Sequence, residues 1–206
     1  MLVSHLAFAN DVIIFYNGAK SSLQRILSFL QEYEGLQIGP KLISWHKPLI
    51  GEFKLNADGS SKDAFQNAAG GGLLRDHTGN LIFGFSENFG PANLLQAKLM
   101  ALHRGLFLCI EYNISSIWIE MDAKIVVQMI HEGHQGSYQT RYLLAFIRKC
   151  LSGFTFRFSH IHREGNQAAD YLFNQGHMHH NLQVFAQAEG KLRGILRLGK
   201  LNLPYV

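Results

Sequence analysis

Apolar and polar positions along the middle of the chain form patterns typical of a mixed sheet. Three alternating runs separated by Gly, Asn and Asp turns predict an antiparallel meander, within residues 53–61, 69–79 and 80–88. The elements expected next are a helix over about 92–112, a strand at 115–122, helices at 123–133 and 139–150, a strand at 154–161 and a helix from near Asn166. Strands that alternate with helices favour parallel crossovers, so the pattern predicts an α/β domain with helices on the faces of a mixed sheet.

The two ends of the chain show different patterns from the middle. Residues 6–16 form two apolar strand-like runs joined by Ala9-Asn10-Asp11, and an amphipathic helix is expected after them. Residues 39–51 hold two of the four prolines and no clear period, which indicates a junction. After Gln175 the periodicity fades into a basic end, KLRGILRLGKLNLPYV. We therefore expect three parts, which are a hairpin with a helix at 1–44, a domain at 45–177 and a basic tail at 178–206.

Composition is typical of a packed globular protein. The 206 residues are 47% hydrophobic and 17% charged, and no apolar stretch approaches the ~20 residues of a membrane helix. Cys109 and Cys150 lie in apolar helical runs, where buried reduced thiols are expected. The N-terminus lacks the basic region of a secretory signal. We expect an intracellular, soluble monomer with no membrane partner. The formal net charge of +4 is compatible with a nucleic-acid partner and equally with a solvated basic surface.

Three aspartates lie where predicted strands stop or helices begin. They are Asp58, Asp122 and Asp170. Scattered acids that converge at the end of a sheet commonly hold divalent metal against a phosphodiester. Taken singly, each also fits an ordinary turn or helix-cap acid. Lys98 lies on the apolar stripe of its predicted helix, so its side chain is expected to face the sheet that carries these acids.

Four segments, FKLNADGSS, QAKLMALHRGL, IWIEMDAKIVVQMI and FRFSHIHREGNQAADYL, occur in an order that resembles the ribonuclease H domain of plant non-LTR retrotransposons. The resemblance covers roughly residues 45–177. It implies a ribonuclease H-like fold, with a mixed five-stranded sheet made of an antiparallel meander plus parallel strands, and helices on both faces. It also implies two Mg²⁺ ions that serve hydrolysis of the RNA strand of an RNA–DNA hybrid. Asp58, Asp122 and Asp170 match metal-binding acids of that family, whereas Lys98 stands in place of a glutamate.

The lysine changes what the resemblance implies. Three carboxylates and one ammonium carry a charge of −2, where four carboxylates would carry −4. We expect Lys98 to pair with the aspartates and to occupy the place of a metal ion. Two hypotheses follow, a hybrid ribonuclease with weakened activity, or a binding module or inert relic that no longer cleaves.

Further residues are expected near a nucleic acid. The expected contacts are Gly59, Ser60, Lys62, Arg75, Arg163 and Asn166, the last of which also fits a helix cap. His160 and His162 alternate along a strand, and they face either the site as auxiliary groups or the solvent. The run 70–72 is all glycine but has no Lys-Ser or Lys-Thr after it, so close backbone approach explains it better than a phosphate loop does.

The N-terminal segment HLAFANDVIIFYNGAK resembles the palm hairpin of a reverse transcriptase, whose Phe-Ala-Asp-Asp turn holds catalytic aspartates. The turn here reads Phe8-Ala9-Asn10-Asp11, so an asparagine replaces the first aspartate. The rest of a polymerase is missing from the sequence as well. We therefore expect no polymerase activity.

Overall fold

The computed structural model describes residues 5–9, 12–16, 43–201 and 203–205, and the chain divides into two compact units, 1–42 and 43–206. In the first unit, β1 (His5–Ala9) pairs antiparallel with β2 (Val12–Tyr16). This pairing confirms the two predicted apolar strands. The turn at Asn10-Asp11 and the helix expected after it lie outside the described residues.

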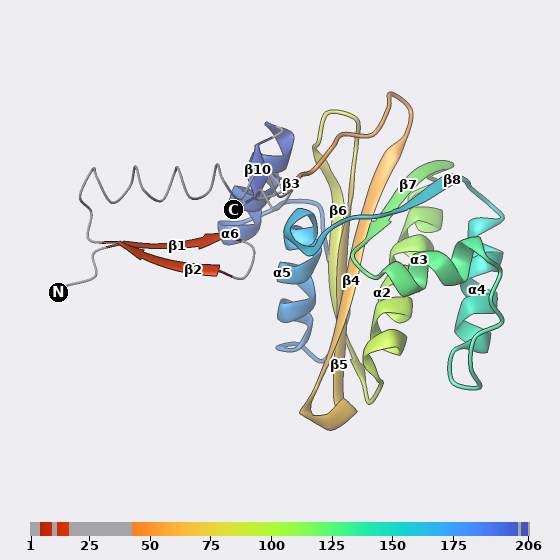
Figure 1. The fold of residues 1–206 in the computed structure, drawn as a ribbon. Helices are drawn as coiled ribbons and strands as arrows, with labels where there is room; N and C mark the ends of the chain where they lie inside the picture. Colours follow the sequence, from red (N-terminus) through yellow and green to blue (C-terminus); the bar gives the residue numbers. More distant parts are fainter. Residues whose placement is uncertain (1–4, 10–11, 17–42, 202, 206) are drawn as a thin grey trace. The chain divides into compact units, whose positions relative to one another are not determined.

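A six-stranded mixed sheet forms the centre of the second unit (Figure 1), in the order β8-β7-β4-β5-β6-β9. The antiparallel meander consists of β4 (Phe53–Lys62), β5 (Asn67–Arg75) and β6 (Leu81–Gly90). The parallel strands are β7 (Ser116–Met121), which pairs with β4, and β8 (Thr155–His160), which pairs with β7. The predicted sheet is thus confirmed. A sixth strand, β9 (Gln183–Phe185), pairs with β6 and is too short to show a periodic pattern.

Helices cover both faces of this sheet, as Figure 1 shows, with α2 (Leu94–Glu111) on one side and α5 (Gln167–Gly176) on the other. Two adjacent glycines of β5 fix this arrangement. A Cβ at Gly70 would lie 2.8 Å from the Cβ of Ala101 in α2, and a Cβ at Gly71 would lie 2.4 Å from the backbone N of Phe173 in α5. Successive strand residues point to opposite faces, so both helices pack closely where side chains are missing. The close approach predicted for this glycine run is confirmed.

The α2 side holds the larger core. Asn93 begins α2 with a reciprocal cap, in which its side chain accepts from Gln96 N at 2.9 Å and Gln96 Oε1 accepts from Asn93 N at 3.0 Å. Two further helices, α3 (Lys124–His131) and α4 (Arg141–Leu151), lie on the same side of the sheet in Figure 1. The buried side chains of this core include Leu55, Phe83, Leu99, Leu102, Leu106, Ile119, Val126, Leu144 and Ile147.

The α5 side is completed by residues beyond the predicted domain. There α6 (Gly190–Lys200) packs Leu192, Ile195 and Leu196 into a core with Trp45 and Leu73. In addition, β10 (Pro204–Tyr205) pairs with β3 (Ile43–Ser44). The segment expected to be a basic tail therefore carries an amphipathic helix that covers part of the sheet.

Two short 3₁₀ turns complete the described elements, η1 (Asp63–Phe65) between β4 and β5 and η2 (Arg163–Asn166) before α5. Cys109 and Cys150 are free thiols, as expected, but only Cys109 is buried, because Cys150 is half-buried. Among the residues with described positions, no helix is both long and apolar enough to cross a bilayer.

Candidate functional site

Two of the predicted site aspartates lie where β4 and β7 separate. The last residues paired between these strands are Asn56 and Glu120. Beyond this point β4 continues along β5 and carries Asp58, whereas β7 ends at Met121, directly before Asp122. Asp58 is only 3% exposed. The split between the strands therefore holds two carboxylates, one of them almost completely removed from water.

Lys98 enters this split from α2. Its helix lies against β4 because Gly59 has no side chain, and a Cβ there would lie 2.4 Å from the backbone C of Ala97. The Lys98 ammonium donates to Asp58 Oδ1 at 2.5 Å and to Asp122 Oδ1 at 2.7 Å. The predicted pairing of Lys98 with these two aspartates is thus confirmed, and one cation joins two carboxylates from different strands.

Burial and the neighbouring charges change the pKa values of Asp58 and Lys98. Burial raises the pKa of Asp58 to about 6; the Lys98 ammonium opposes this change and the charge of Asp122 adds to it. Burial would lower the pKa of Lys98, but the two carboxylates outweigh it and raise that pKa above its ordinary value. The ammonium consequently stays protonated at neutral pH and acts as a fixed cation in the site.

Asp170 lies in the first turn of α5 and has a different partner. Its Oδ1 accepts from Arg163 Nη2 at 3.1 Å, and its Oδ2 accepts from Asn174 Nδ2 at 3.3 Å. The Asp170 side chain is 28% exposed. The third aspartate thus pairs with a surface arginine in place of Lys98.

Two of the residues predicted to contact a nucleic acid are exposed cations close to Asp170. They are Arg163 and Lys62, whose Nζ lies 3.5 Å from Asn174 Oδ1. Ser60, which precedes them on β4, is half-buried, and Gly59 is buried with its N–H donating to Asp58. Lys62 and Arg163 are therefore the members of the predicted set that offer free surface to a phosphate.

The prediction that Arg75 and Asn166 contact a nucleic acid requires correction. Arg75 is 1% exposed, with its guanidinium carbon 3.4 Å from the centre of the Trp45 ring, so it has no surface to offer a phosphate. Asn166 is also 1% exposed, and its side chain donates to the carbonyl of Ala57 at 3.3 Å rather than capping α5. Both residues join parts of the fold together.

His160 and His162 lie beside the site and differ in how far they are buried. His160 is half-buried, and its Nε2 lies 3.1 Å from the backbone oxygen of Asp122. Burial lowers the pKa of His160. His162 is exposed, with its ring centre 5.5 Å from that of His160. His160 therefore supports the loop that carries Asp122, and His162 faces solvent.

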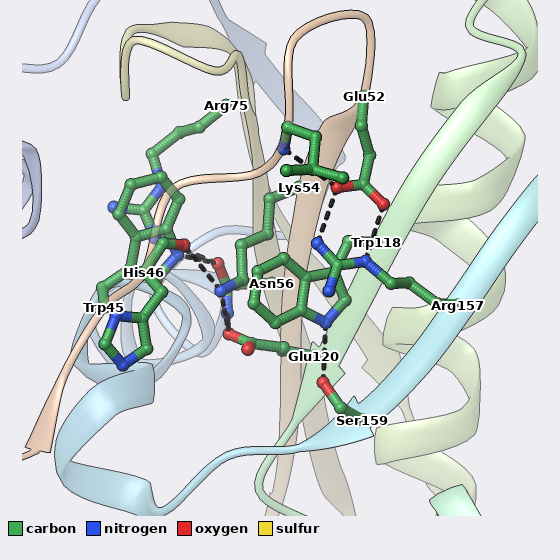
Figure 2. Close-up of polar contacts among 11 residues, drawn as sticks. Trp45, His46, Glu52, Lys54, Asn56, Arg75, Trp118, Glu120, Arg157 and Ser159 are labelled. Atoms are coloured by element: carbon green, nitrogen blue, oxygen red, sulfur yellow. Dashed lines mark hydrogen bonds and ion pairs between the residues drawn. The ribbon is translucent and has the colours of Figure 1, made fainter.

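A buried polar cluster between β4 and β7 was not predicted. Figure 2 shows its central residue, Lys54, whose Nζ lies 2.7 Å from Glu120 Oε2, 2.8 Å from the carbonyl of His46 and 3.4 Å from the Trp118 ring centre. Burial lowers the pKa of Lys54 to about 8, although Glu120 opposes this change. The cluster extends along the sheet to Asn56, two residues before Asp58, because Asn56 Nδ2 lies 3.4 Å from Glu120 Oε2.

The outer edge of this cluster is closed by a second ion pair. Arg157 donates to both carboxylate oxygens of Glu52 at 2.7 Å, and its guanidinium carbon lies 3.5 Å from the Trp118 ring centre (Figure 2). The polar residues at 54, 56 and 58 alternate with apolar ones along β4. That alternation within a central strand was the signal in the sequence that could have identified the cluster.

The donor set does not fit a pair of divalent metal ions as it stands. Hard cations need several free carboxylate oxygens. Here one oxygen of Asp58 and one of Asp122 accept from Lys98, and Asp170 is paired with Arg163. Throughout the described part of the chain, no group of three His, Cys, Asp or Glu residues is placed to hold a metal ion.

Comparison with known proteins places this sequence in a family. The pattern of the reverse transcriptase-like family matches residues 56–176. A protein of Arabidopsis thaliana, named "Putative ribonuclease H protein", is 33% identical over 135 residues, which are 65% of this chain and 22% of that protein. The chain thus spans about a fifth of the length of this relative.

Solved structures show the same fold. Ribonuclease H1 of Halobacterium salinarum is 24% identical with a TM-score of 0.58, over 61% of this chain and 96% of that one. The ribonuclease H domain of a Mycobacterium tuberculosis protein is 21% identical with a TM-score of 0.58, over 62% and 94%. LC11 ribonuclease H1, solved in complex with an RNA/DNA hybrid, is 22% identical with a TM-score of 0.56, over 60% and 94%. The chain therefore belongs to the reverse transcriptase-like family and carries a ribonuclease H-like domain of the retrotransposon type.

Proposed function

We propose that this chain is a nucleic-acid-binding protein of retrotransposon origin that binds RNA–DNA hybrids, and that Lys98 has weakened or abolished the metal-dependent cleavage implied by the family. The observation that carries the proposal is the pair of short contacts from Lys98 to Asp58 and Asp122. In this proposal the Lys98 ammonium substitutes for the cations that hybrid cleavage would require from solution.

The electrostatic balance favours the lysine over metal. An ammonium held about 4 Å from a divalent ion would be repelled by about 8 kcal/mol at an effective dielectric constant near 20. A lysine that swung toward water would avoid much of this cost. It would then give up two ion pairs in a place where its side chain is only 15% exposed. Metal binding must therefore compete with an internal cation that is already bonded to the ligands.

The binding half of the proposal rests on the surface around Asp170. Lys62 and Arg163 are exposed cations that lie near each other through Asn174 and Asp170. Cations of this kind position a nucleic acid through its phosphates and confer a steep salt dependence. The complex of LC11 ribonuclease H1 with an RNA/DNA hybrid supports the choice of hybrid as ligand. Magnesium is the ion that the family resemblance implies for the ancestral site, with Asp58, Asp122 and Asp170 as its ligands.

Two alternatives remain within the same family. An active ribonuclease would require Lys98 to leave the aspartates when substrate and metal arrive. An inert relic would keep the fold and lose the binding surface as well. The first alternative requires metal-dependent cleavage, and the second requires the absence of hybrid binding.

The binding experiment uses the full chain and a fluorescent RNA–DNA hybrid in EDTA. We expect binding without metal, an affinity that falls steeply as salt increases, and preference for hybrid over duplex DNA of the same sequence. Replacing both Lys62 and Arg163 by alanine should weaken binding and flatten the salt dependence. Replacing Arg193 and Arg197 of α6, which carry equal charge and are also exposed, should have a smaller effect. Equal affinity at low and high salt, or no preference for hybrid, would refute the binding proposal.

A further inference from the structure

The stretch between Glu132 and Glu164 contains no acidic residue. Its cations are Arg141, Arg148, Lys149, Arg157 and Arg163. Arg157 and Arg163 are paired with Glu52 and Asp170, and the surplus of positive charge that remains in the stretch favours a polyanionic partner. The stretch includes the loop between α3 and α4, which contributes nothing to the Lys98 site.

Two tyrosines in this stretch are presented to solvent on either side of an arginine. The guanidinium carbon of Arg141 lies 5.1 Å from the ring centre of Tyr138 and 4.8 Å from that of Tyr142, and its Nη2 lies 3.3 Å from Tyr142 Oη. Tyr138 is 80% exposed and Tyr142 is 64% exposed. We call these three residues the tyrosine platform. It offers two aromatic faces and a cation to whatever binds there.

The platform is held by an ordered turn. Thr140 is 2% exposed, and its Oγ1 accepts from Ser137 N at 3.0 Å. The carbonyl of Ser137 accepts from Thr140 N at 3.0 Å and from Arg141 N at 2.9 Å. The buried Thr140 thus fixes the backbone on both sides of Tyr138, whereas the ring of Tyr138 points to solvent. Such a ring costs little conformational entropy when it binds a ligand, because its backbone is already in place.

The platform is also connected to the helix that carries Lys98. Gln139, next to Tyr138, accepts from Asn93 Nδ2 at 3.2 Å through its side chain and from Gln96 Nε2 at 3.5 Å through its carbonyl. Asn93 and Gln96 form the cap of α2. A ligand on the platform would therefore lie beside the first turn of α2, near a hybrid bound at the site.

We propose that the tyrosine platform binds single-stranded nucleic acid, with bases stacked on Tyr138 and Tyr142 and a phosphate on Arg141. The inference rests on the proposed function, because the strand in question is a single-stranded extension of the bound hybrid. Stacking on aromatic faces accepts any base, and arginine adds cation–π and phosphate contacts. A nucleic acid is favoured over a protein partner because the stretch around the platform contains no acidic residue.

The test compares three ligands: a blunt RNA–DNA hybrid, the same hybrid with a single-stranded extension of about ten nucleotides, and that single strand alone. The length is within the range that aromatic grooves accommodate. We expect the extension to raise the affinity of the unaltered protein at least about fivefold, the gain for one stacked base. The Y138A/Y142A double variant should lose this gain and bind the blunt hybrid as before. The Y138F/Y142F variant keeps both rings and should keep the gain.

The outcomes separate the two proposals. If the blunt hybrid binds and the extension adds nothing, the platform proposal is overturned and the proposed function stands. If only the isolated single strand binds, and Y138A/Y142A abolishes this, the platform proposal stands and hybrid binding fails. If neither ligand binds, both fail. Self-association that Y138A/Y142A abolishes, with no gain from the extension, would assign the platform to a protein interface.

Discussion

Asp58 and Gly71 lie directly opposite each other in the pairing of β4 with β5. Because Gly71 has no side chain, the backbone of α5 approaches this part of the sheet at Leu172 and Phe173. Asp170 lies in the first turn of the same helix. Gly71, which lies opposite Asp58, thus determines how closely α5, the helix that carries Asp170, can approach the sheet.

Gly71→Ala should therefore destabilise the protein. The added Cβ would lie 2.4 Å from the backbone N of Phe173 and 2.5 Å from the backbone C of Leu172, so the helix must move. We expect a loss of about 1–3 kcal/mol in the free energy of unfolding, measured with urea. Gly194→Ala is the control, because nothing lies within 4 Å of the added Cβ. Gly194 lies in the middle of α6, where alanine is the better helix former, so this change should increase the free energy of unfolding by at most about 1 kcal/mol. Equal stabilities for Gly71→Ala and the unaltered protein would contradict the close contact.

The predictions that held depend on periodic patterns. Alternation and turn residues indicated β4, β5 and β6, and the apolar stripe of α2 indicated that Lys98 would face the sheet. The pairing of Lys98 with Asp58 and Asp122 followed from its position and from the cost of burying a lone charge.

The features that were missed depend on contacts between distant segments. Nothing near Arg75 in the sequence indicates that Trp45 covers it, and the choice of Arg163 as partner of Asp170 depends on how η2 leads into α5. The amphipathic period of α6 was hidden because seven of its eleven residues are Lys, Arg or Gly. Such pairings are set by tertiary packing, which local patterns do not encode.

Lys54 should make stability depend on pH in the basic range. The folded protein releases the proton of Lys54 near pH 8, whereas the unfolded chain keeps it to about pH 10.5. Between these values the unfolded state binds more protons, so raising the pH increases the free energy of unfolding. The contribution is at most about 3 kcal/mol.

The measurement is the pH dependence of urea unfolding from pH 7.5 to 10.5 for the unaltered protein and for Lys54→Met. Subtracting the two curves removes the contributions of other groups, including Cys109, whose pKa is raised by burial. The difference should grow in favour of the unaltered protein as the pH rises. Lys47→Met changes an exposed lysine and should match the unaltered protein. Parallel curves for the unaltered protein and Lys54→Met would show that Lys54 is not desolvated as described.

Residues 1–42 should be dispensable for the fold of the second unit. A chain that starts at Ile43 keeps β3 and the fully buried Trp45, and should unfold in a single transition close to that of the full chain. A chain that starts at His46 loses Trp45 and should be less stable by about 3–5 kcal/mol. Insolubility of the longer fragment, or equal stability of the two, would count against this division of the chain.

Lys98 should stabilise the protein in the absence of metal. Lys98→Gln leaves two buried or half-buried carboxylates without their cation, a change that typically costs about 3–5 kcal/mol. The loss should be smaller near pH 5 than at pH 8, because the raised pKa of Asp58 allows its carboxylate to become protonated. Lys124→Gln, at an exposed position of α3, provides the control. A Lys98→Gln protein as stable as the control at pH 8 would mean that the ion pairs contribute nothing to the fold.

The central claim is that Lys98 takes the place of metal, and cleavage of an RNA–DNA hybrid in Mg²⁺ tests it most directly. We predict little or no cleavage by the unaltered protein, and metal binding with measurable cleavage by Lys98→Glu, because this change restores a fourth acid and removes the repelling charge. Adding Asp58→Asn to Lys98→Glu should abolish the gain and exclude a contaminating nuclease. Strong Mg²⁺-dependent cleavage by the unaltered protein, abolished by Asp58→Asn alone, would contradict the claim.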